Sequence, residues 1–405
     1  MEKYRNSNRK METGDHSKNG ASPKSQMSKI NINFVEMKKV LILFFVVLLI
    51  IQCDYAPKTT FIPLEKDYDY ISPFYAELAE VKDSNLYGFI DKKGKEIIPC
   101  IFDYVNYFSE GLAAVKKNGK WGFIDRKGKE IVSCKYDDTQ DFNEGLASVK
   151  LNGKWGFIDI NGKEVIPLKY EKTWGFYENF AWVMMNDKWG VIDKKGKEVI
   201  PHKYYNGSQL FAFNSGFTNI SYFGEDDCPV LIDTSGKKYI LCQYRNIFHF
   251  SEGLASVSKN GKEGFIDTNL KEIIPCKYDY VSIFYNEMAQ IRSKGKFGFI
   301  NRKGEEIVSY KYDDAGYFLD GMAYVKINDK WGYINKKGNE VIPCQYEFAG
   351  KFHDGLAVVR LNNKYGYVNK TGIEIIPCIY DNAYEFWGGV APVKYQGKWM
   401  IMKIS

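Results

Sequence analysis

The stretch WGFIDRKGKEIVSCKYD at residues 121–137 is one copy of a phrase that returns along most of the chain. About five residues after it comes FNEGLASV at residues 142–149, and this second phrase returns with the first. The Trp position of the phrase is filled ten times, and eight of the nine intervals are 34 residues, whereas one interval is 40. A fixed period of this length indicates tandem units that bury their apolar faces against one another. The ten positions are Tyr87, Trp121, Trp155, Trp189, Pro229, Glu263, Phe297, Trp331, Tyr365 and Trp399.

Each unit is predicted to contain three β-strands. Residues 111–116 alternate in polarity, and Asn118-Gly119 is a strong signal for a two-residue hairpin. A second strand at 121–124 ends at a turn over 125–128, and a third strand is expected at 130–136. The unit is therefore a three-stranded antiparallel meander of about 34 residues.

The repeat predicts an all-β protein built as a tandem array. An open or superhelical solenoid is the first expectation, because β-propellers typically have about 4–8 blades of four strands each. A closed, propeller-like ring is the alternative.

Several repeated positions are expected to serve packing. A glycine within a strand weakens it, so the glycine that follows the Trp position in eight of ten units predicts close approach of a neighbouring ring or backbone. Proline near the middle of the third strand predicts an edge, a bulge or a strand end. The acid at the turn, as in Asp125, is replaced by Asn301, Asn335 and Asn369, which keep the capping oxygen but lose the titratable group. The residues assigned to the structural repeat are Trp121, Gly122, Trp155, Gly156, Trp189, Gly190, Gly298, Trp331, Gly332 and Gly366.

These residues resemble the WG repeat, also called the KWG repeat. The resemblance rests on KWGFID at 120–125 and 154–159 and on KWGYIN at 330–335, and it covers the chain from about Phe74 to the C-terminus. It implies an all-β bacterial repeat protein, often exported, and it brings no catalytic residues.

The N-terminal part resembles a bacterial lipoprotein signal. Residues 37–39 begin a short basic region, and 40–51 form an apolar run of 12 residues, which is too short to span a bilayer. The run ends at Cys53, the expected site of lipidation, although Gln52 stands where a small residue is usual. A plain secretory signal or short anchor is the alternative. Residues 1–36 are polar and aperiodic and are expected to be disordered, with Met27 or Met37 as alternative starts.

The remaining organisation follows the repeat. A linker is expected at 54–73, a first half of the array at 74–206, a divergent unit with an insertion at 207–228, and a second half at 229–405.

Charge gives little indication of a nucleic-acid partner. The formal net charge is +6, but residues 1–52 carry +5 of it, which leaves the repeats almost neutral. A basic patch that would bind phosphates is not indicated.

Six of the eight cysteines occupy one phase of the repeat. The same position holds Leu168, His202 and Tyr310 in other units, which favours a partly buried packing position. Disulfides between adjacent units are the alternative for an exported protein, and zinc is disfavoured because no Cys-x-x-Cys occurs. The six are Cys100, Cys134, Cys242, Cys276, Cys344 and Cys378.

No catalytic motif stands out from the repeat, so the chain is expected not to be an enzyme. The four histidines, His16, His202, His249 and His353, have no recognisable nucleophile beside them. No phosphate-binding loop, dinucleotide fingerprint or metalloprotease motif is present, and neither a metal nor a cofactor is predicted.

The candidate ligand-binding site lies where the repeat is broken. Six extra residues fall between Tyr204 and Pro229, and aromatic residues gather there and in the preceding unit. A harmless insertion that bulges into solvent is the alternative. The candidate residues are Trp174, Trp182, Phe211, Phe213, Phe217, Tyr222 and Phe223.

The sequence therefore predicts an exported, lipid-anchored binding module of the bacterial cell envelope. Its extended repeat surface would contact a protein or carbohydrate partner, with the membrane reached through the lipid and no nucleic acid involved. The alternative is a structural spacer or a protein that assembles with copies of itself.

Overall fold

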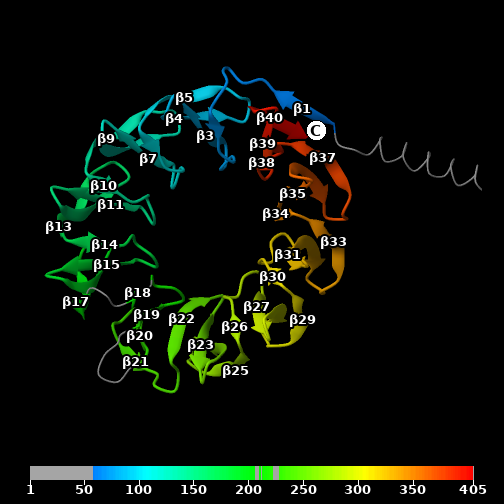
Figure 1. Ribbon diagram of the computed structural model, residues 1–405. Coiled ribbons are helices and arrows are strands. Elements are labelled where there is room, and N and C mark those ends of the chain that lie inside the picture. Colours follow the sequence, from blue (N-terminus) through cyan, green and yellow to red (C-terminus); the bar gives the residue numbers. More distant parts are fainter. Residues whose placement is uncertain (1–57, 206–208, 211, 222–227, 405) are drawn as a thin grey trace, which may run out of the picture. The chain divides into compact units, whose positions relative to one another are not determined.

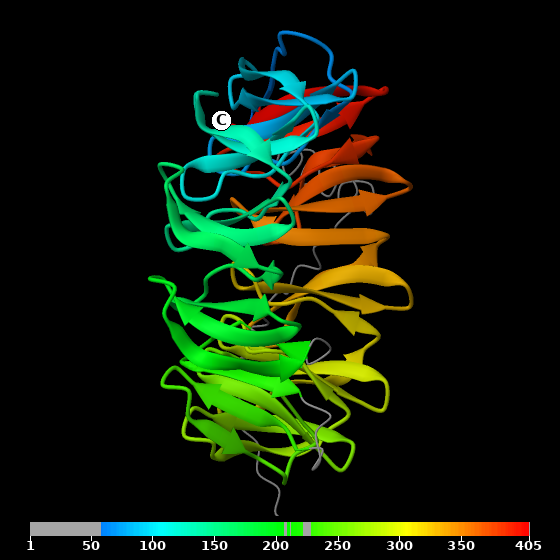
Figure 2. The ribbon, with the colours of Figure 1, turned by 90° about the vertical axis from the view of Figure 1, so that its left-hand side faces the viewer.

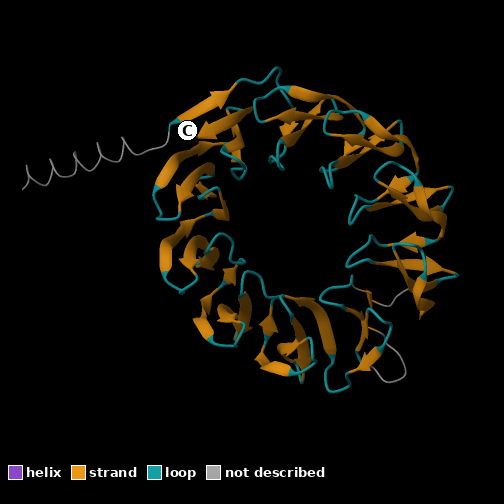
Figure 3. Ribbon diagram, turned by 180° about the vertical axis from the view of Figure 1, so that it is seen from behind, coloured by secondary structure: helices purple, strands orange, loops and turns teal. Residues whose placement is uncertain are grey.

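A computed structural model describes residues 58–404 of the protein, except 206–208, 211 and 222–227. These residues belong to one compact unit, Pro57–Ser405. Every regular element in the described part is a β-strand, as Figure 3 shows, so the all-β prediction is confirmed. The described residues contain no helix that is long and apolar enough to cross a membrane.

The strands form ten four-stranded antiparallel sheets, which we call blades 1 to 10. The first five blades contain, in chain order, β2 (Tyr70–Ile71), β3 (Leu78–Asp83), β4 (Leu86–Asp91) and β5 (Glu96–Phe102); β6 (Tyr104–Val105), β7 (Leu112–Lys117), β8 (Lys120–Asp125) and β9 (Glu130–Tyr136); β10 (Asp138–Thr139), β11 (Leu146–Leu151), β12 (Lys154–Asp159) and β13 (Glu164–Tyr170); β14 (Lys172–Thr173), β15 (Phe180–Met185), β16 (Lys188–Asp193) and β17 (Glu198–Tyr205); and β18 (Gln209–Leu210), β19 (Phe217–Ser221), β20 (Val230–Asp233) and β21 (Lys238–Ile240).

The second five blades follow the same order. They contain β22 (Asn246–Ser251), β23 (Leu254–Lys259), β24 (Lys262–Asp267) and β25 (Glu272–Tyr278); β26 (Tyr280–Val281), β27 (Met288–Ser293), β28 (Lys296–Asn301) and β29 (Glu306–Tyr312); β30 (Asp314–Ala315), β31 (Met322–Ile327), β32 (Lys330–Asn335) and β33 (Glu340–Tyr346); β34 (Phe348–His353), β35 (Leu356–Leu361), β36 (Lys364–Asn369) and β37 (Glu374–Tyr380); and β38 (Asn382–Ala383), β39 (Val390–Tyr395), β40 (Lys398–Ile404) and β1 (Thr59–Ile62).

The blades follow one another around a ring. In Figure 1 the fourth strands, such as β9 and β33, lie on the outside, and the first strands, such as β30 and β38, lie towards the central opening. The ring is closed, because β1 from the N-terminal end pairs with β40 from the C-terminal end, with Thr59 opposite Ile404. Figure 2 shows these blue and red strands side by side. The closed ring, the alternative arrangement, is therefore supported, and the expected open solenoid is not formed.

The prediction of three strands per blade was wrong by one strand. The missing strand is the innermost one, which in blades 1 to 4, for example, has only two residues, as in β10, where Asp138 pairs with Lys150 and Thr139 with Val149. Two residues are too few to show an alternating pattern, so the sequence reads as a linker at this point. The extra strand also removes the objection that the units have too few strands for a closed ring.

The repeated glycine is explained by a bulge in the fourth strand. Opposite Gly122 the register jumps from Phe123↔Val132 to Trp121↔Tyr136, so extra residues of β9 fold over the glycine. A Cβ atom on Gly122 would lie 2.4 Å from the carbonyl oxygen of Val132. The close neighbour of the glycine is therefore backbone rather than an aromatic ring. The proline that occupies the bulge in most blades lies on an outer edge strand, as predicted.

The turn acids have the structural role that the sequence predicts. The Oδ1 atom of Asp125 accepts hydrogen bonds from the backbone amides of Lys127 and Lys129, both at 2.9 Å. Asn335 makes the same two contacts in blade 8, at 3.0 and 3.1 Å. Because the amide serves as well as the carboxylate, the charge has no part in the turn.

Adjacent blades are joined by pairs of aromatic rings. Phe123 of β8 meets Phe142 of the next blade edge-to-face, with ring centroids 4.7 Å apart, and both side chains are buried. The same contact joins Phe157 to Phe176 at 4.8 Å and recurs farther round the ring. The core is thus a series of clusters between neighbouring blades, as expected for stacked units.

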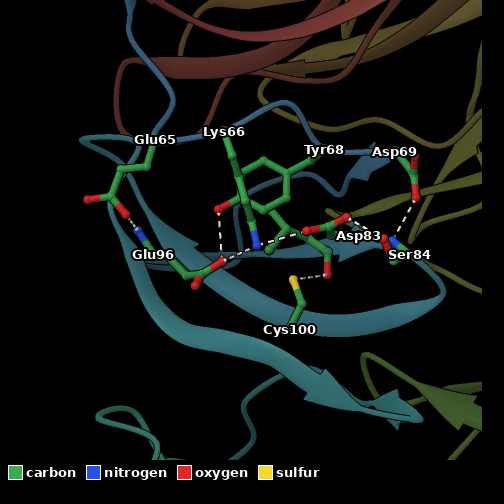
Figure 4. A network of polar contacts seen from close by, with 9 residues as sticks. Glu65, Lys66, Tyr68, Asp69, Asp83, Ser84, Glu96 and Cys100 are labelled. Atoms are coloured by element: carbon green, nitrogen blue, oxygen red, sulfur yellow. Dashed lines mark hydrogen bonds and ion pairs between the residues drawn. The ribbon is translucent and has the colours of Figure 1, made fainter.

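The segment that leads from β1 into blade 1 is fixed by a polar network (Figure 4). Lys66 contacts Asp83 at 2.9 Å and Glu96 at 3.0 Å, and the Tyr68 hydroxyl donates to Glu96 at 3.2 Å. Asp69 accepts a hydrogen bond from the Ser84 amide at 3.0 Å. Residues 54–73 were predicted to be a linker, but this region contains β1 and β2 and completes the ring.

The segment with the broken repeat also belongs to the ring. Strands β18 to β21 form blade 5, and the disulfide between Cys228 and Cys242, 14 residues apart, lies in its second half. The insertion therefore interrupts the repeated phrase without removing a blade.

Candidate binding surface

Exposed aromatic side chains gather on the inner side of the ring. Eleven aromatic side chains of the described residues are at least 36% exposed. Nine of them lie in a first strand or in the segment that joins it to the second strand of the same blade. The nine, which we call the inner aromatics, are Tyr75, Tyr104, Tyr107, Trp174, Tyr177, Phe248, Tyr285, Tyr317 and Phe348.

The segment that carries many of these rings is held in place by a tight turn. In blade 3 Glu144 and Gly145 both have positive φ, 55° and 85°, and Asn143 and Leu146 exchange backbone hydrogen bonds across the turn. Two successive residues with positive φ are the mark of a type I′ turn, for which glycine is favoured. The E-G pairs at 110–111, 144–145 and 252–253 thus form a second hairpin turn in their blades.

Acidic side chains of these turns link several blades to the next one. The Glu110 carboxylate accepts a hydrogen bond of 2.8 Å from the Gly145 amide, and Glu144 accepts one of 2.9 Å from the Asn179 amide. The same link joins Glu252 to the amide of Glu287 at 3.0 Å. Charge-assisted bonds of this kind make the inner surface a rigid frame for the aromatic rings.

A hollow on this surface extends over blades 2 to 4 and has a volume of about 500 Å³. Trp174 and Tyr177 of blade 4 lie on one side, and Gln140, Asp141 and Asn143 of blade 3 lie on the other. The volume is within the range of roughly 300–1,000 Å³ that is typical of small-molecule sites.

A second aromatic group lies where the ring closes. Four rings follow one another here. The ring centroids are 4.3 Å apart for His353 and Trp387, 6.2 Å for Trp387 and Tyr75, and 4.1 Å for Tyr75 and Tyr107. Beside them, burial raises the pKa of Glu80 to about 7. Burial also raises the pKa of Tyr107, with smaller contributions from Tyr75 and Glu80.

The structure separates the candidate residues of the sequence analysis into different environments. Trp174 is 39% exposed and lines the hollow, whereas Trp182 and Phe213 are 2% and 3% exposed and pack in one core cluster. Phe217 is partly buried against Phe250, with centroids 5.3 Å apart. Trp182 and Phe213 are core residues that a ligand does not reach, so their prediction as ligand-binding residues was wrong, whereas that of Phe217 stays a prediction. Phe211, Tyr222 and Phe223 lie outside the described residues.

Sequence reasoning missed most of the inner aromatics. They occur at positions that differ in residue type from blade to blade, so no repeated motif marks them. A usable signal was present in the short segment before the second hairpin turn, which contains a tyrosine in five blades: Tyr75, Tyr107, Tyr177, Tyr285 and Tyr317.

The cysteines divide into five free thiols and one disulfide among the described residues. Cys100, Cys134, Cys276, Cys344 and Cys378 are free and partly buried in the fourth-strand bulge, which confirms the packing prediction for these five. Cys134, for example, points its sulfur at the Val115 carbonyl oxygen, 3.9 Å away, and burial raises its pKa. The packing prediction was wrong for Cys242, because Cys228, which is outside the repeat phase, bonds to it.

The described residues show no group of histidine, cysteine and acidic side chains that could hold a metal ion. His202 lies 2.6 Å from Glu198 within the same strand, and His353 packs against Trp387.

Ten four-stranded blades in a ring closed by a strand from the opposite terminus define a β-propeller, here with ten blades. More particularly, the chain belongs to the WG-containing repeat family. The repeat of this family matches nine times, at residues 87–121, 121–155, 155–189, 189–220, 231–262, 264–297, 297–331, 331–365 and 365–399.

The solved structures to which the chain shows a likeness differ strongly from it in sequence. A eukaryotic initiation factor is 9% identical, with 70% of this chain and 89% of that chain covered and a TM-score of 0.48. BamB from Moraxella catarrhalis is 12% identical, with 69% and 96% covered and a TM-score of 0.34. The WD40 domain of SCAP from fission yeast is 7% identical, with 86% and 98% covered and a TM-score of 0.31. A comparison with curated proteins found no significant match.

Proposed function

We propose that the protein is an exported, lipid-anchored binding module that presents the inner side of its propeller to a protein or carbohydrate partner. The observation that carries this proposal is the position of the inner aromatics, which account for nine of the eleven exposed aromatic side chains of the described residues. Aromatic rings are enriched in binding surfaces because they offer a large apolar area at a low cost in conformational entropy. The proposal includes neither a catalytic activity nor a nucleic-acid partner.

Two observations support export. Residues 37–53 have the pattern of a lipoprotein signal that ends at Cys53. The disulfide between Cys228 and Cys242 is a bond that persists in oxidising compartments and is rare in the cytosol. Both agree with a position in the bacterial cell envelope.

The position of β1 limits how an anchored ring would be held. Five residues separate Cys53 from Thr59, so the chain can extend about 20 Å at most between the lipid and the start of β1. Since β1 is the outermost strand of blade 10, the tether meets the outside of the ring. An anchor at this place leaves the inner aromatics free for a partner.

Self-assembly through strand edges is the alternative function, and the closed ring disfavours it. An open array would offer two free ends to a further copy, but β1 completes blade 10 and closes the ring, so these ends are absent.

The anchor is tested by labelling cells with an alkyne analogue of palmitate. We expect label on the wild-type protein and none on a Cys53→Ala variant, which should leave the membrane fraction. Equal labelling of both proteins, or a wild-type protein found in the cytosol, would contradict the proposed anchor.

Binding is tested separately by photo-crosslinking in the cell envelope. A photoreactive residue placed at Tyr285 should give a crosslinked product, and the same residue placed at Tyr395, which is 38% exposed in the hairpin of β39 and β40, should give much less. Equal products at the two positions would contradict a binding surface on the inner side.

A further inference from the structure

We propose that the hollow lined by blades 2 to 4 binds a neutral carbohydrate, with one sugar ring lying against Trp174. This inference rests on the proposed binding function and names the ligand class of one site within it.

The aromatic side of the hollow is exposed and held in position. The side chains of Trp174 and Tyr177 are 39% and 48% exposed. The backbone amide of Trp174 donates a hydrogen bond of 2.9 Å to the Trp182 carbonyl oxygen. The indole ring of Trp174 meets that of Trp189 edge-to-face, with ring centroids 6.4 Å apart. A fixed aromatic ring offers an apolar surface to the C–H face of a sugar ring, with little entropy lost on binding.

The polar side of the hollow offers hydrogen-bond acceptors. Asn143 uses its Nδ2 atom to donate to the Phe176 carbonyl oxygen at 2.7 Å, and Ser109 uses its hydroxyl to donate to the Phe142 carbonyl oxygen at 2.7 Å. Asp141 accepts from Asn106 through Oδ1 at 2.8 Å. These bonds use the Ser109 hydroxyl hydrogen and one of the two Asn143 amide hydrogens, and they leave the Asn143 Oδ1 and Asp141 Oδ2 atoms as acceptors for a ligand. A ligand rich in hydroxyl donors meets this need.

The charge of the hollow argues against an ionic ligand. Asp141 is the one charged residue among those that line it, so an anion would meet a carboxylate and no cation. Asp141 as a whole residue is exposed, yet desolvation raises the pKa of its carboxyl group above the usual value. A site built to hold a cation would instead favour the charged carboxylate.

Other hollows on the inner side have different chemistry. The one between Tyr285 and Tyr317 adds the apolar Ile283 and Leu319 and the cationic Lys351. The one beside Trp331 contains Asp314, Glu385 and Lys351. The hollow at Trp174 is distinguished by combining exposed rings with amide side chains and a single acid.

The test uses the full chain, purified in a zwitterionic detergent that has no sugar head group. Binding is measured on a panel of immobilised neutral oligosaccharides built from glucose, galactose, mannose or N-acetylglucosamine, with sialylated and sulfated glycans and a Lys/Arg-rich peptide beside them. We expect at least one neutral oligosaccharide to bind, and Trp174→Ala to weaken this binding at least tenfold. Tyr177→Ala is the second variant at the site, and Tyr395→Ala is the matched control, because its ring has nearly the same exposure as that of Trp174.

The possible results separate the ligand class from the binding function. Binding of no neutral glycan, equal binding by Trp174→Ala, or preference for the charged glycans or the basic peptide would overturn the carbohydrate proposal. The binding function would survive such a result if the inner-side crosslink at Tyr285 still formed. Loss of both signals would overturn the two proposals together. The unfolding temperature of each variant is measured as a control. A variant that unfolds at the wild-type temperature is still folded, so its loss of binding comes from the substituted side chain.

Discussion

The indole Nε1–H of Trp399 donates a hydrogen bond of 3.2 Å to the backbone carbonyl oxygen of Asp69, although the two residues are 330 positions apart. Trp399 occupies the Trp position of the last repeat, and Asp69 immediately precedes the first strand of blade 1. Beside this bond, Lys398 contacts Asp67 at 2.9 Å and Tyr384 stacks on the Trp399 ring at 5.6 Å. The last blade is therefore joined to the first by side chains as well as by the pairing of β1 with β40.

Replacing Trp399 by Phe should weaken the closure. The variant keeps most of the buried ring but loses the indole donor, and we expect a loss of about 1 kcal/mol in the free energy of unfolding. Urea unfolding followed by circular dichroism measures the change. The matched control is Trp121→Phe at the same repeat position of blade 2, where no closing bond is involved. An equal loss in both variants would contradict a special role for the bond to Asp69.

The glycine beneath the fourth-strand bulge should not tolerate a side chain. A Cβ atom at position 122 would lie 2.4 Å from backbone oxygen, so Gly122→Ala forces the bulge to move, and we expect a cost of about 1–3 kcal/mol. Gly175→Ala is the control, because its new Cβ atom would lie 3.6 Å from its nearest neighbour. Thermal unfolding compares the two. A Gly122→Ala protein as stable as Gly175→Ala would show that the bulge is not as tight as described.

Glu80 should make stability depend on pH. Burial raises the pKa of its carboxyl group in the folded protein from 4.5 to about 7. The folded state therefore keeps this proton over a range in which the unfolded state has lost it, and stability falls as the pH rises from about 4.5 to 7. Glu80→Gln should remove this loss, with a gain on the order of 1 kcal/mol at pH 8, since part of the carboxyl group stays hydrated. Urea unfolding at pH 5 and pH 8 measures the free energy of unfolding of the wild type and the variant. Glu77→Gln is the control, because Glu77 is exposed. A gain that is the same at both pH values would speak against titration of Glu80.

The disulfide should be a single, specific bond. Peptide mapping without reduction is expected to show Cys228 linked to Cys242 and the remaining described cysteines open to alkylation after unfolding. Because the bond closes a loop of about 14 residues, its loss in a Cys228→Ser/Cys242→Ser variant should cost roughly 3 kcal/mol. Detection of a bond between Cys100 and Cys134 would contradict the packing role of the repeat cysteines.

Local features of the fold were predictable because they depend on neighbouring residues. The hairpin at Asn118-Gly119, the turn capped by Asp125 and the strands beside them all follow from the repeated sequence. Ring closure could not be predicted in the same way. The strand at 59–62 precedes the first full copy of the repeated phrase, and its partner at 401–404 is about 340 residues away along the chain, so no local pattern joins the two.

The binding surface was only partly predictable for a similar reason. Trp174 and Trp182 are eight residues apart and look equally suited to contact a partner, but Trp182 lies in β15, whose central residues are buried on both faces of the strand. Trp174 follows a two-residue strand that turns towards the inside of the ring. The difference depends on the innermost strand, which the sequence pattern did not reveal.

The measurement that tests the account most directly is excimer fluorescence from pyrene placed on both ends of the ring. Thr60 and Lys403 pair across β1 and β40, and both are exposed, so pyrene-labelled cysteines at these positions should lie in contact. The full chain labelled at both positions is predicted to show strong excimer emission. A variant with a new cysteine at only one of the two positions is predicted to show only the background emission from the native thiols. Emission from the pair no stronger than that background would contradict a closed ring, and with it the inner surface on which the proposed function depends.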